Sequence, residues 1–144
     1  MEERGTPLSV VVDCSAFGAL ILDDEADHVL PGLQRCVVHS EAVVPAHFML
    51  EVASAIQTAI RRQRMPLAGA EEVSLTIASL PITVDQDTNR NLWSGTWKLA
   101  ERHHLTVYDA AYLELALRLG ATLATKDKAL RNAAWAEDVE LFGR

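Results

Sequence analysis

The sequence has no long apolar run and little cysteine. Its apolar stretches, such as 8–12 and 17–22, fall far short of the roughly 20 residues that span a bilayer, so we expect no membrane segment. The first residues lack a cationic stretch followed by an apolar one, and no secretory signal is expected. Cys14 and Cys36 have no metal-ligand spacing. Reduced thiols in a cytoplasmic protein are the simplest interpretation.

Positive charge is also scarce. The 13 Lys and Arg residues face 20 Asp and Glu residues, which gives a formal charge of −7. A net acidic protein does not attract a polyanion through its overall field. A nucleic-acid function would therefore need a local basic patch or a bound cation.

What is present is typical of one globular domain. The chain has 144 residues, of which 49% are hydrophobic and 23% charged, so we expect a single domain over 1–144 with a real core. Short apolar runs predict strands, and helical spacing of apolar residues predicts helices. The expected strands are 8–12, 42–44, 82–84, 121–125 and 139–142, and the expected helices are 15–22, one starting at 23–27, 46–64, 67–80, 85–103, 107–119 and 127–135. This alternation predicts an α/β fold, a three-layer α/β/α sandwich around a mainly parallel sheet.

Four acidic residues lie where such a sheet forms its sites, beyond the carboxyl ends of strands. Asp13 and Asp127 follow expected strands, whereas Glu51 and Asp109 lie early in expected helices. Each has an ordinary explanation when taken alone. Asp13 and Asp127 could cap helices, Asp109 has capping-box spacing after Thr106, and Glu51 could be a solvated helix residue.

Taken together, the four acids predict a cation site. Carboxylates that meet at one end of a sheet repel each other, and partial burial adds a desolvation cost for each charge. A hard divalent cation with oxygen ligands removes both penalties. Mg²⁺ or Mn²⁺ suits this ligand set, whereas zinc would prefer His or Cys.

Four segments of the sequence resemble the PIN-domain nucleases, and the length is similar to that of VapC-type toxins of toxin–antitoxin pairs. The segments are 10–15, 44–51, 105–112 and 123–130, in the order of that family and across nearly the whole chain. The resemblance implies an acidic site for Mg²⁺ or Mn²⁺ made by Asp13, Glu51, Asp109 and Asp127. It also implies supporting hydroxyl groups at Ser15 and Thr125.

The expected function is that of a metal-dependent endoribonuclease. Water activated by the metal would attack the phosphodiester in line and leave 5′-phosphate and 3′-hydroxyl ends. The number of metal ions, one or two, stays open, as does the identity of the RNA. The resemblance further implies a small antitoxin protein that blocks the metal site, and a homodimer of the toxin.

Two groups of cations could hold the RNA backbone. Lys126, Lys128 and Arg131 flank Asp127, and we expect these residues to contact phosphates. A second group, Arg61, Arg62 and Arg64, lies at a predicted helix end, where favourable contact with the helix dipole is an equally good explanation.

Two other functions compete with the nuclease. A haloacid dehalogenase-like phosphatase also begins with a strand that ends in Asp, but it needs a second Asp at the position of Ser15. A non-catalytic PIN-fold interaction module would not need all four acids. Dinucleotide binding and a serine or cysteine hydrolase are excluded, because the glycine-rich loop and the nucleophile elbow are both missing.

Overall fold

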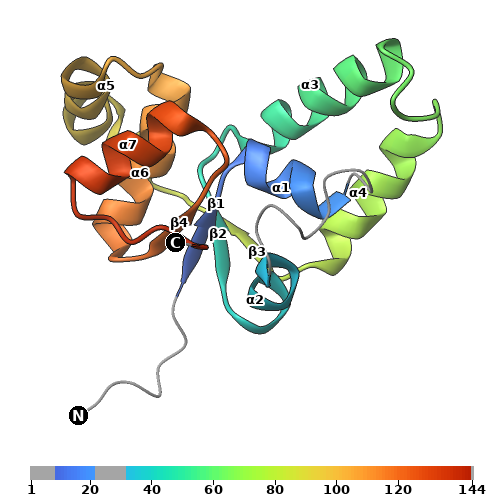
Figure 1. Ribbon diagram of the computed structural model, residues 1–144, viewed down its shortest axis with the longest axis horizontal. Coiled ribbons are helices and arrows are strands. Elements are labelled where there is room, and N and C mark those ends of the chain that lie inside the picture. The colour runs from blue at the N-terminus through green and yellow to red at the C-terminus, as the bar shows by residue number, and fades with distance from the viewer. Residues whose placement is uncertain (1–8, 22–31, 144) are drawn as a thin grey trace.

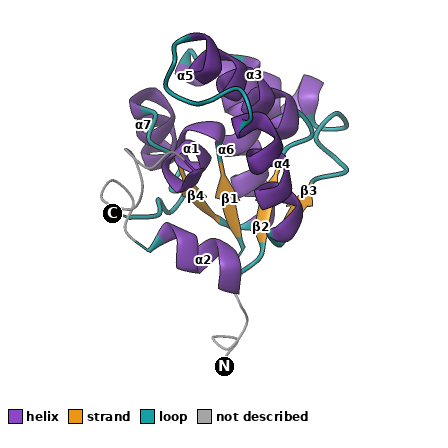
Figure 2. Ribbon diagram, turned by 90° about the vertical axis from the view of Figure 1, so that its right-hand side faces the viewer, coloured by secondary structure: helices purple, strands orange, loops and turns teal. Residues whose placement is uncertain are grey.

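Four short parallel strands form the centre of the molecule. The computed structural model describes residues 9–21 and 32–143 (Figure 1). In this part of the chain the strands are β1 (Val10–Val12), β2 (Ala42–Val44), β3 (Ile82–Val84) and β4 (Thr122–Ala124). Their order in the sheet is β3-β2-β1-β4, and every pair is parallel (Figure 2).

Helices cover both faces of this sheet. They are α1 (Cys14–Ile21), α2 (Leu33–His39), α3 (Phe48–Arg61), α4 (Gly69–Ser79), α5 (Trp97–His103), α6 (Val107–Leu119) and α7 (Lys128–Ala136). Figure 1 shows α1, α3 and α4 on one side of the sheet and α5, α6 and α7 on the other. The predicted α/β/α sandwich is therefore confirmed. No described helix is long and apolar enough to cross a membrane.

The strands have only three residues each, and the sheet is stabilised by the hydrophobic core around it. Every residue of β1 and β2 is buried, as expected for a parallel sheet covered on both faces. Helix α6 packs on β1 and β4 and is buried along most of its length. The β-branched valines of β1 belong to the same hydrophobic core as Phe17 and Phe48, whose rings contact each other edge to face.

The strand order reverses between β1 and β4. The chain moves from β1 to β2 and β3 in one direction, and then crosses back to place β4 beside β1. As a result β1 leads into α1 on one face, whereas β4 leads into α7 on the other. Such a switch point is where open α/β sheets bind their ligands, because the two loops diverge there.

Several predicted elements match the structure closely. The strands 42–44 and 82–84 and the helix 107–119 have the predicted limits. Gly120 ends that helix with a φ of 63°, the left-handed conformation expected of a C-cap glycine. Residue 8, residue 22 and the acidic run 23–27, where a second helix was predicted to begin, lie outside the described residues.

The predicted helix over 85–103 is wrong in its first third. Residues 86–91 form turns, a π-helical segment follows at Leu92–Thr96, and α5 begins only at Trp97. Polar side chains hold this turn: Thr88 Oγ1 donates to the Asp85 carboxylate at 2.9 Å, and Asn91 Nδ2 donates to the Asp87 backbone carbonyl at 2.9 Å. Such bonds compete with helix formation, and the apolar pattern does not reveal them.

The predicted strand over 139–142 is also wrong. In the described part of the chain this segment contributes one parallel bridge between Leu123 and Leu141. Leu123 donates to the Glu140 carbonyl, and Phe142 donates to the Leu123 carbonyl, both at 2.9 Å. Left-handed backbone at Asp138 and Gly143, with φ of 60° and 81°, turns the chain on either side and stops the pairing there.

Candidate active site

Asp13 lies directly after β1 and is 4% exposed. Its Oδ1 accepts hydrogen bonds from the Ser15 hydroxyl at 2.7 Å and from the Ala16 amide at 2.8 Å. Its Oδ2 accepts a hydrogen bond from the Thr125 hydroxyl. Burial, together with the negative charge of Asp127, raises the pKa of Asp13, although these hydrogen bonds oppose the rise. The carboxylate is therefore held in place at the base of the site.

Ser15 and Thr125 join the two loops of the switch point. Each hydroxyl donates to Asp13 and accepts an amide hydrogen from the loop after β4. The Lys126 amide donates to Ser15 Oγ at 2.9 Å, and the Asp127 amide donates to Thr125 Oγ1 at 3.0 Å. Ser15 and Thr125, for which the resemblance implies a supporting role, thus both contact Asp13 and hold the loop that carries Asp127 beside it.

Asp127 begins α7 as its N-cap residue. One carboxylate oxygen, Oδ2, accepts a hydrogen bond from the Leu130 amide at 2.9 Å. Asp13 bonds the Ala16 amide at the start of α1 in the same way. The capping explanation is therefore correct for both residues, and it does not compete with a role in the site, because the cap is what orients each carboxylate.

Glu51 reaches the site from α3. The Tyr112 hydroxyl, on α6, donates to Glu51 Oε1 at 2.5 Å, and His47 Nε2 lies 3.6 Å from the same oxygen. Burial and this bond to a carboxylate both raise the pKa of Tyr112, so the phenol stays protonated as a donor. Sequence reasoning missed Tyr112. The available indication was a hydroxyl three residues after Asp109, on the same face of the predicted helix.

Asp109 lies in the first turn of α6, where its amide donates to Thr106 Oγ1 at 3.1 Å. Burial raises the pKa of its carboxyl to about 6, and the charges of Asp127, Asp13 and Glu51 add to the rise. All four predicted acids are therefore close enough to interact electrostatically. The structure brings them together at the switch point, from four different elements.

The donor set fits a hydrated cation better than a closed metal cage. Among the described residues, no three His, Cys, Asp or Glu side chains are gathered tightly enough to enclose an ion by themselves. Mg²⁺ keeps several waters and is usually bound through only one or two carboxylates. Mutual repulsion at Asp109 and burial at Asp13 are penalties that such a cation would relieve.

A cysteine, a histidine and two tryptophans have structural contacts or a protonated state that explain them without catalysis. Burial raises the pKa of the Cys14 thiol to about 12, and the charges of Glu51 and Asp13 contribute, so Cys14 is not a thiolate nucleophile. His103, which lies on α5, contacts Glu137 at 2.6 Å. Trp93 and Trp97 pack against each other with ring centroids 5.3 Å apart.

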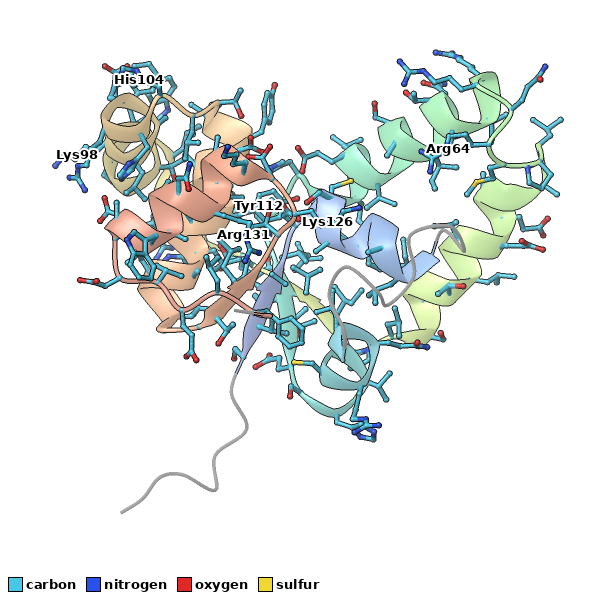
Figure 3. All side chains as sticks on the ribbon, in the orientation of Figure 1. Arg64, Lys98, His104, Tyr112, Lys126 and Arg131 are labelled. Atoms are coloured by element: carbon cyan, nitrogen blue, oxygen red, sulfur yellow. The ribbon has the colours of Figure 1, made fainter. Side chains whose placement is uncertain are left out.

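The predicted phosphate-binding residues differ in their surroundings. Lys126 lies in the loop beside Ser15, near the acids, and Figure 3 labels both Lys126 and Arg131 at the carboxyl end of the sheet. Arg131 Nη1 donates to the Thr125 carbonyl at 2.8 Å, so its guanidinium also holds the loop that carries Asp127. Lys128 is exposed at the start of α7.

A family model described as "PIN domain" matches residues 10–136. Ribonuclease VapC3 of Mycobacterium tuberculosis is 35% identical over 133 residues, which cover 88% of this chain and 88% of VapC3. The crystal structure of PAE2754 from Pyrobaculum aerophilum aligns with a TM-score of 0.63 at 21% identity, over 88% of this chain and 84% of that one.

A second solved structure has the same fold. Mycobacterium tuberculosis VapC20, described as a Sarcin-Ricin loop cleaving toxin, aligns with a TM-score of 0.59 at 17% identity, over 86% of this chain and 94% of that one. The family match spans β1 to α7, and therefore includes all four acids of the switch point. This chain belongs to the PIN-domain family.

Proposed function

We propose that this protein is a divalent metal-dependent endoribonuclease and the toxin of a toxin–antitoxin pair. The observation that carries the proposal is the meeting of Asp13, Glu51, Asp109 and Asp127 at the switch point of the sheet. The names of the relatives support the same activity, since VapC3 is called a ribonuclease. We place the whole activity in one nuclease domain.

Mg²⁺ or Mn²⁺ is the proposed cofactor, held by Asp13, Asp109 and Asp127 directly or through water, with Glu51 as a further ligand or as a base. When bound, such an ion polarises the phosphate and lowers the pKa of water. In the proposed hydrolysis water would attack phosphorus in line and lose a proton to Glu51 or to solvent. The bond from phosphorus to the 3′ oxygen would break, and that oxygen would take up a proton from solvent, which leaves a 5′-phosphate and a 3′-hydroxyl.

The side chains around the acids prepare them for this role. Ser15 and Thr125 fix the orientation of Asp13 through its two oxygens, and Tyr112 fixes Glu51 through Oε1. Partners of this kind typically change metal affinity or activity by about 10–100-fold when removed. We propose that Lys126, Lys128 and Arg131 attract the phosphate backbone beside Asp127.

The proposed partners are an RNA substrate, an antitoxin protein and a second copy of the chain, in the cytoplasm. The antitoxin and the homodimer rest on the likeness to VapC toxins. Co-expression with the protein encoded beside it, followed by size-exclusion chromatography with light scattering, tests both. A monomer that elutes alone would contradict these two proposals without affecting the nuclease.

The decisive experiment is RNA cleavage by the purified protein. With Mg²⁺ or Mn²⁺ we expect cleavage products with 5′-phosphate ends, and with EDTA we expect none. Asp13→Asn should lower the cleavage rate by at least about 100-fold, because it removes a buried charge from the cation site. Asp138→Asn, which removes an exposed carboxylate beyond α7, is the matched control.

The same assay tests the phosphatase alternative. A haloacid dehalogenase-like phosphatase would instead need a second Asp where this chain has Ser15, and covalent capture of phosphate on Asp13 would favour that alternative. Cleavage that persists in EDTA, or in the Asp13→Asn variant, would disprove the proposed mechanism.

A further inference from the structure

A groove of about 570 Å³ lies between α1 and α3, and it leads from the acidic site toward the carboxyl end of α3. At its inner end it is lined by Ser15 and Glu51, both part of the site described above. Arg62 and Arg64, at the carboxyl end of α3, also line it, and so does Lys126. Figure 3 labels Arg64 near the far end of α3 and Lys126 next to α1. The groove therefore joins the acidic site to a cluster of cations.

The spacing along α3 explains this layout. Residues 51, 55, 58 and 62 recur at helical intervals, so they share one face of the helix. Because an α-helix rises about 1.5 Å per residue, Arg62 lies about 16 Å from Glu51 along the axis. A polymer that follows this face from the acids would reach the arginines several repeat units later.

The chemistry of the groove fits a phosphate backbone. Among the described residues that line it, Glu51 is the one acid, and Arg62, Arg64 and Lys126 are the bases. The wall of α3 between the two ends carries the exposed small residues Ser54 and Thr58, whose hydroxyls can donate to phosphate oxygens. This arrangement gives the acidic protein the local basic surface that RNA binding requires.

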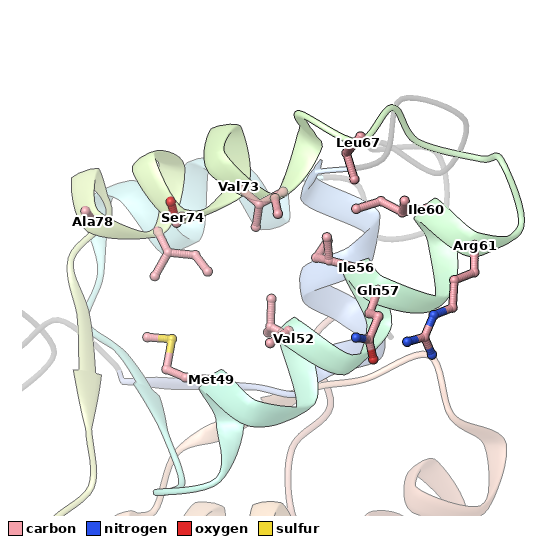
Figure 4. Close-up of a pocket in the computed structure, with 13 residues that line it drawn as sticks. Met49, Val52, Ile56, Gln57, Ile60, Arg61, Leu67, Val73, Ser74 and Ala78 are labelled. Atoms are coloured by element: carbon pink, nitrogen blue, oxygen red, sulfur yellow. The ribbon is translucent and has the colours of Figure 1, made fainter.

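The side of α3 that faces α4 is mainly apolar. A cavity of about 800 Å³ lies between α3 and α4 and is lined by residues such as Met49, Ile56 and Val73, with no acid among its described lining residues (Figure 4). Apolar anchors of this kind are what a partner helix needs. The groove on the α1 side lacks large apolar anchors, which favours a nucleic-acid strand over a protein segment there.

We propose that the groove between α1 and α3 binds the backbone of single-stranded RNA, with Arg62 and Arg64 contacting phosphates a few nucleotides from the cleaved bond. This proposal rests on the proposed nuclease function. It assigns Arg62 and Arg64, two of the three arginines in the second group of cations, to substrate binding, and it places the strand along α3.

The test compares two double variants of equal charge. Arg62→Gln/Arg64→Gln removes both groove cations, whereas Arg61→Gln/Arg90→Gln removes two arginines outside the groove: Arg61 lines the apolar cavity, and the Arg90 side chain is 80% exposed beside Asp87. Binding of a labelled single-stranded oligouridylate is measured by fluorescence anisotropy in EDTA over a range of salt concentrations. We expect the groove pair to weaken binding at least about tenfold and to reduce the salt slope by about 1.4, since each single-strand phosphate contact contributes roughly 0.7. The control pair should resemble the wild type.

A second comparison guards against a loss of folding in the arginine variants. Ser54→Asp adds a negative charge inside the groove, and Gln57→Glu adds one on the side of α3 that lines the apolar cavity. Both positions are exposed, so both variants should keep the melting temperature of the wild type. We expect only Ser54→Asp to weaken RNA binding.

The outcomes separate this proposal from the nuclease function. If the wild type cleaves RNA with Mg²⁺ or Mn²⁺ but the groove variants bind and cleave like their controls, the groove assignment is wrong and the nuclease function stands. If the wild type cleaves no RNA, the nuclease function fails, and the binding curves in EDTA still decide whether the groove holds a strand. Groove variants that lose only a protein partner would also overturn the assignment.

Discussion

At the scale of single residues, the site consists of carboxylates whose negative charges repel one another. Asp13 accepts three hydrogen bonds from Ser15, Ala16 and Thr125, which hold its carboxylate despite burial. Asp109 has less support: its carboxyl feels burial and three neighbouring acids. Ionisation of Asp109 is therefore opposed in the protein without metal.

The pH dependence of stability should reveal this cost. The pKa of Asp109 is raised from 3.8 to about 6 in the folded protein, so the folded state binds a proton more tightly than the unfolded state does. The tighter binding of this proton adds to the free energy of unfolding in full below about pH 4, and the addition is lost as the pH rises through 6. In EDTA, Asp109→Asn should therefore melt at a higher temperature than the wild type at pH 7.5, with little difference at pH 4.

Thermal melts in EDTA at the two pH values measure this difference. Asp138→Asn, outside the site, should show no such dependence. Added Mn²⁺ should raise the melting temperature of the wild type at pH 7.5, because a ligand that binds the folded state stabilises it by mass action. Equal melting temperatures of Asp109→Asn and the wild type at both pH values would contradict the repulsion described here.

At the scale of elements, helices carry the site and the strands only align them. Each strand has three residues, but α6 spans Val107–Leu119 and has a cap at both ends. Thr106 Oγ1 accepts the Asp109 amide at its start, and Gly120 adopts left-handed backbone at its end. The starting cap also fixes the turn from which the Asp109 side chain extends.

Substitution of Gly120 tests the closing cap. A Cβ atom there would meet nothing within 4 Å, so the cost of Gly120→Ala comes only from the φ of 63°. We expect a loss of about 1–2 kcal/mol in the free energy of unfolding, measured by urea denaturation. Gly120→Asn should cost less, because Asn tolerates this conformation. An alanine variant as stable as the wild type would show that the helix end relaxes.

At the scale of the whole molecule, an ion network connects α6 to the opposite edge of the sheet. Arg118 Nη2 lies 2.8 Å from Asp85 Oδ2, directly after β3, and Arg118 Nε lies 2.8 Å from Glu114 Oε2 on its own helix. Hydrogen bonds from Arg118 lower the pKa of Asp85. Because Glu114 is buried, removal of the arginine would leave carboxylates without their counter-charge.

Arg118→Gln should therefore lower the free energy of unfolding by about 2–4 kcal/mol, near the range for broken buried ion pairs. Urea denaturation followed by circular dichroism measures the change. The control is Arg90→Gln, whose 3.7 Å pair with Asp87 is exposed and should be worth less than about 1 kcal/mol. Similar losses in both variants would mean that the network adds no stability of its own.

The sequence alone determined the features that depend on local patterns. Continuous apolar runs predicted β2 and β3, and apolar spacing with a terminal glycine predicted α6. Acids placed after strands or early in helices predicted which carboxylates would meet. These predictions succeeded because the spacing of apolar residues along a strand or helix follows directly from which of its faces is buried. The role of the four acids in binding metal stays a prediction.

Tertiary structure decided the features that depend on distant partners. The turn after Asp85 exists because polar side chains hold it, and the segment 139–142 pairs only at Leu141 because the chain turns on both sides. The Tyr112 bond to Glu51 arises because the start of α3 meets α6 beyond the carboxyl end of the sheet, and the groove that carries Glu51 and Arg62 arises from the packing of α3 against α1. Contacts across such distances in the chain follow from how whole layers pack, and local residue spacing does not encode that packing.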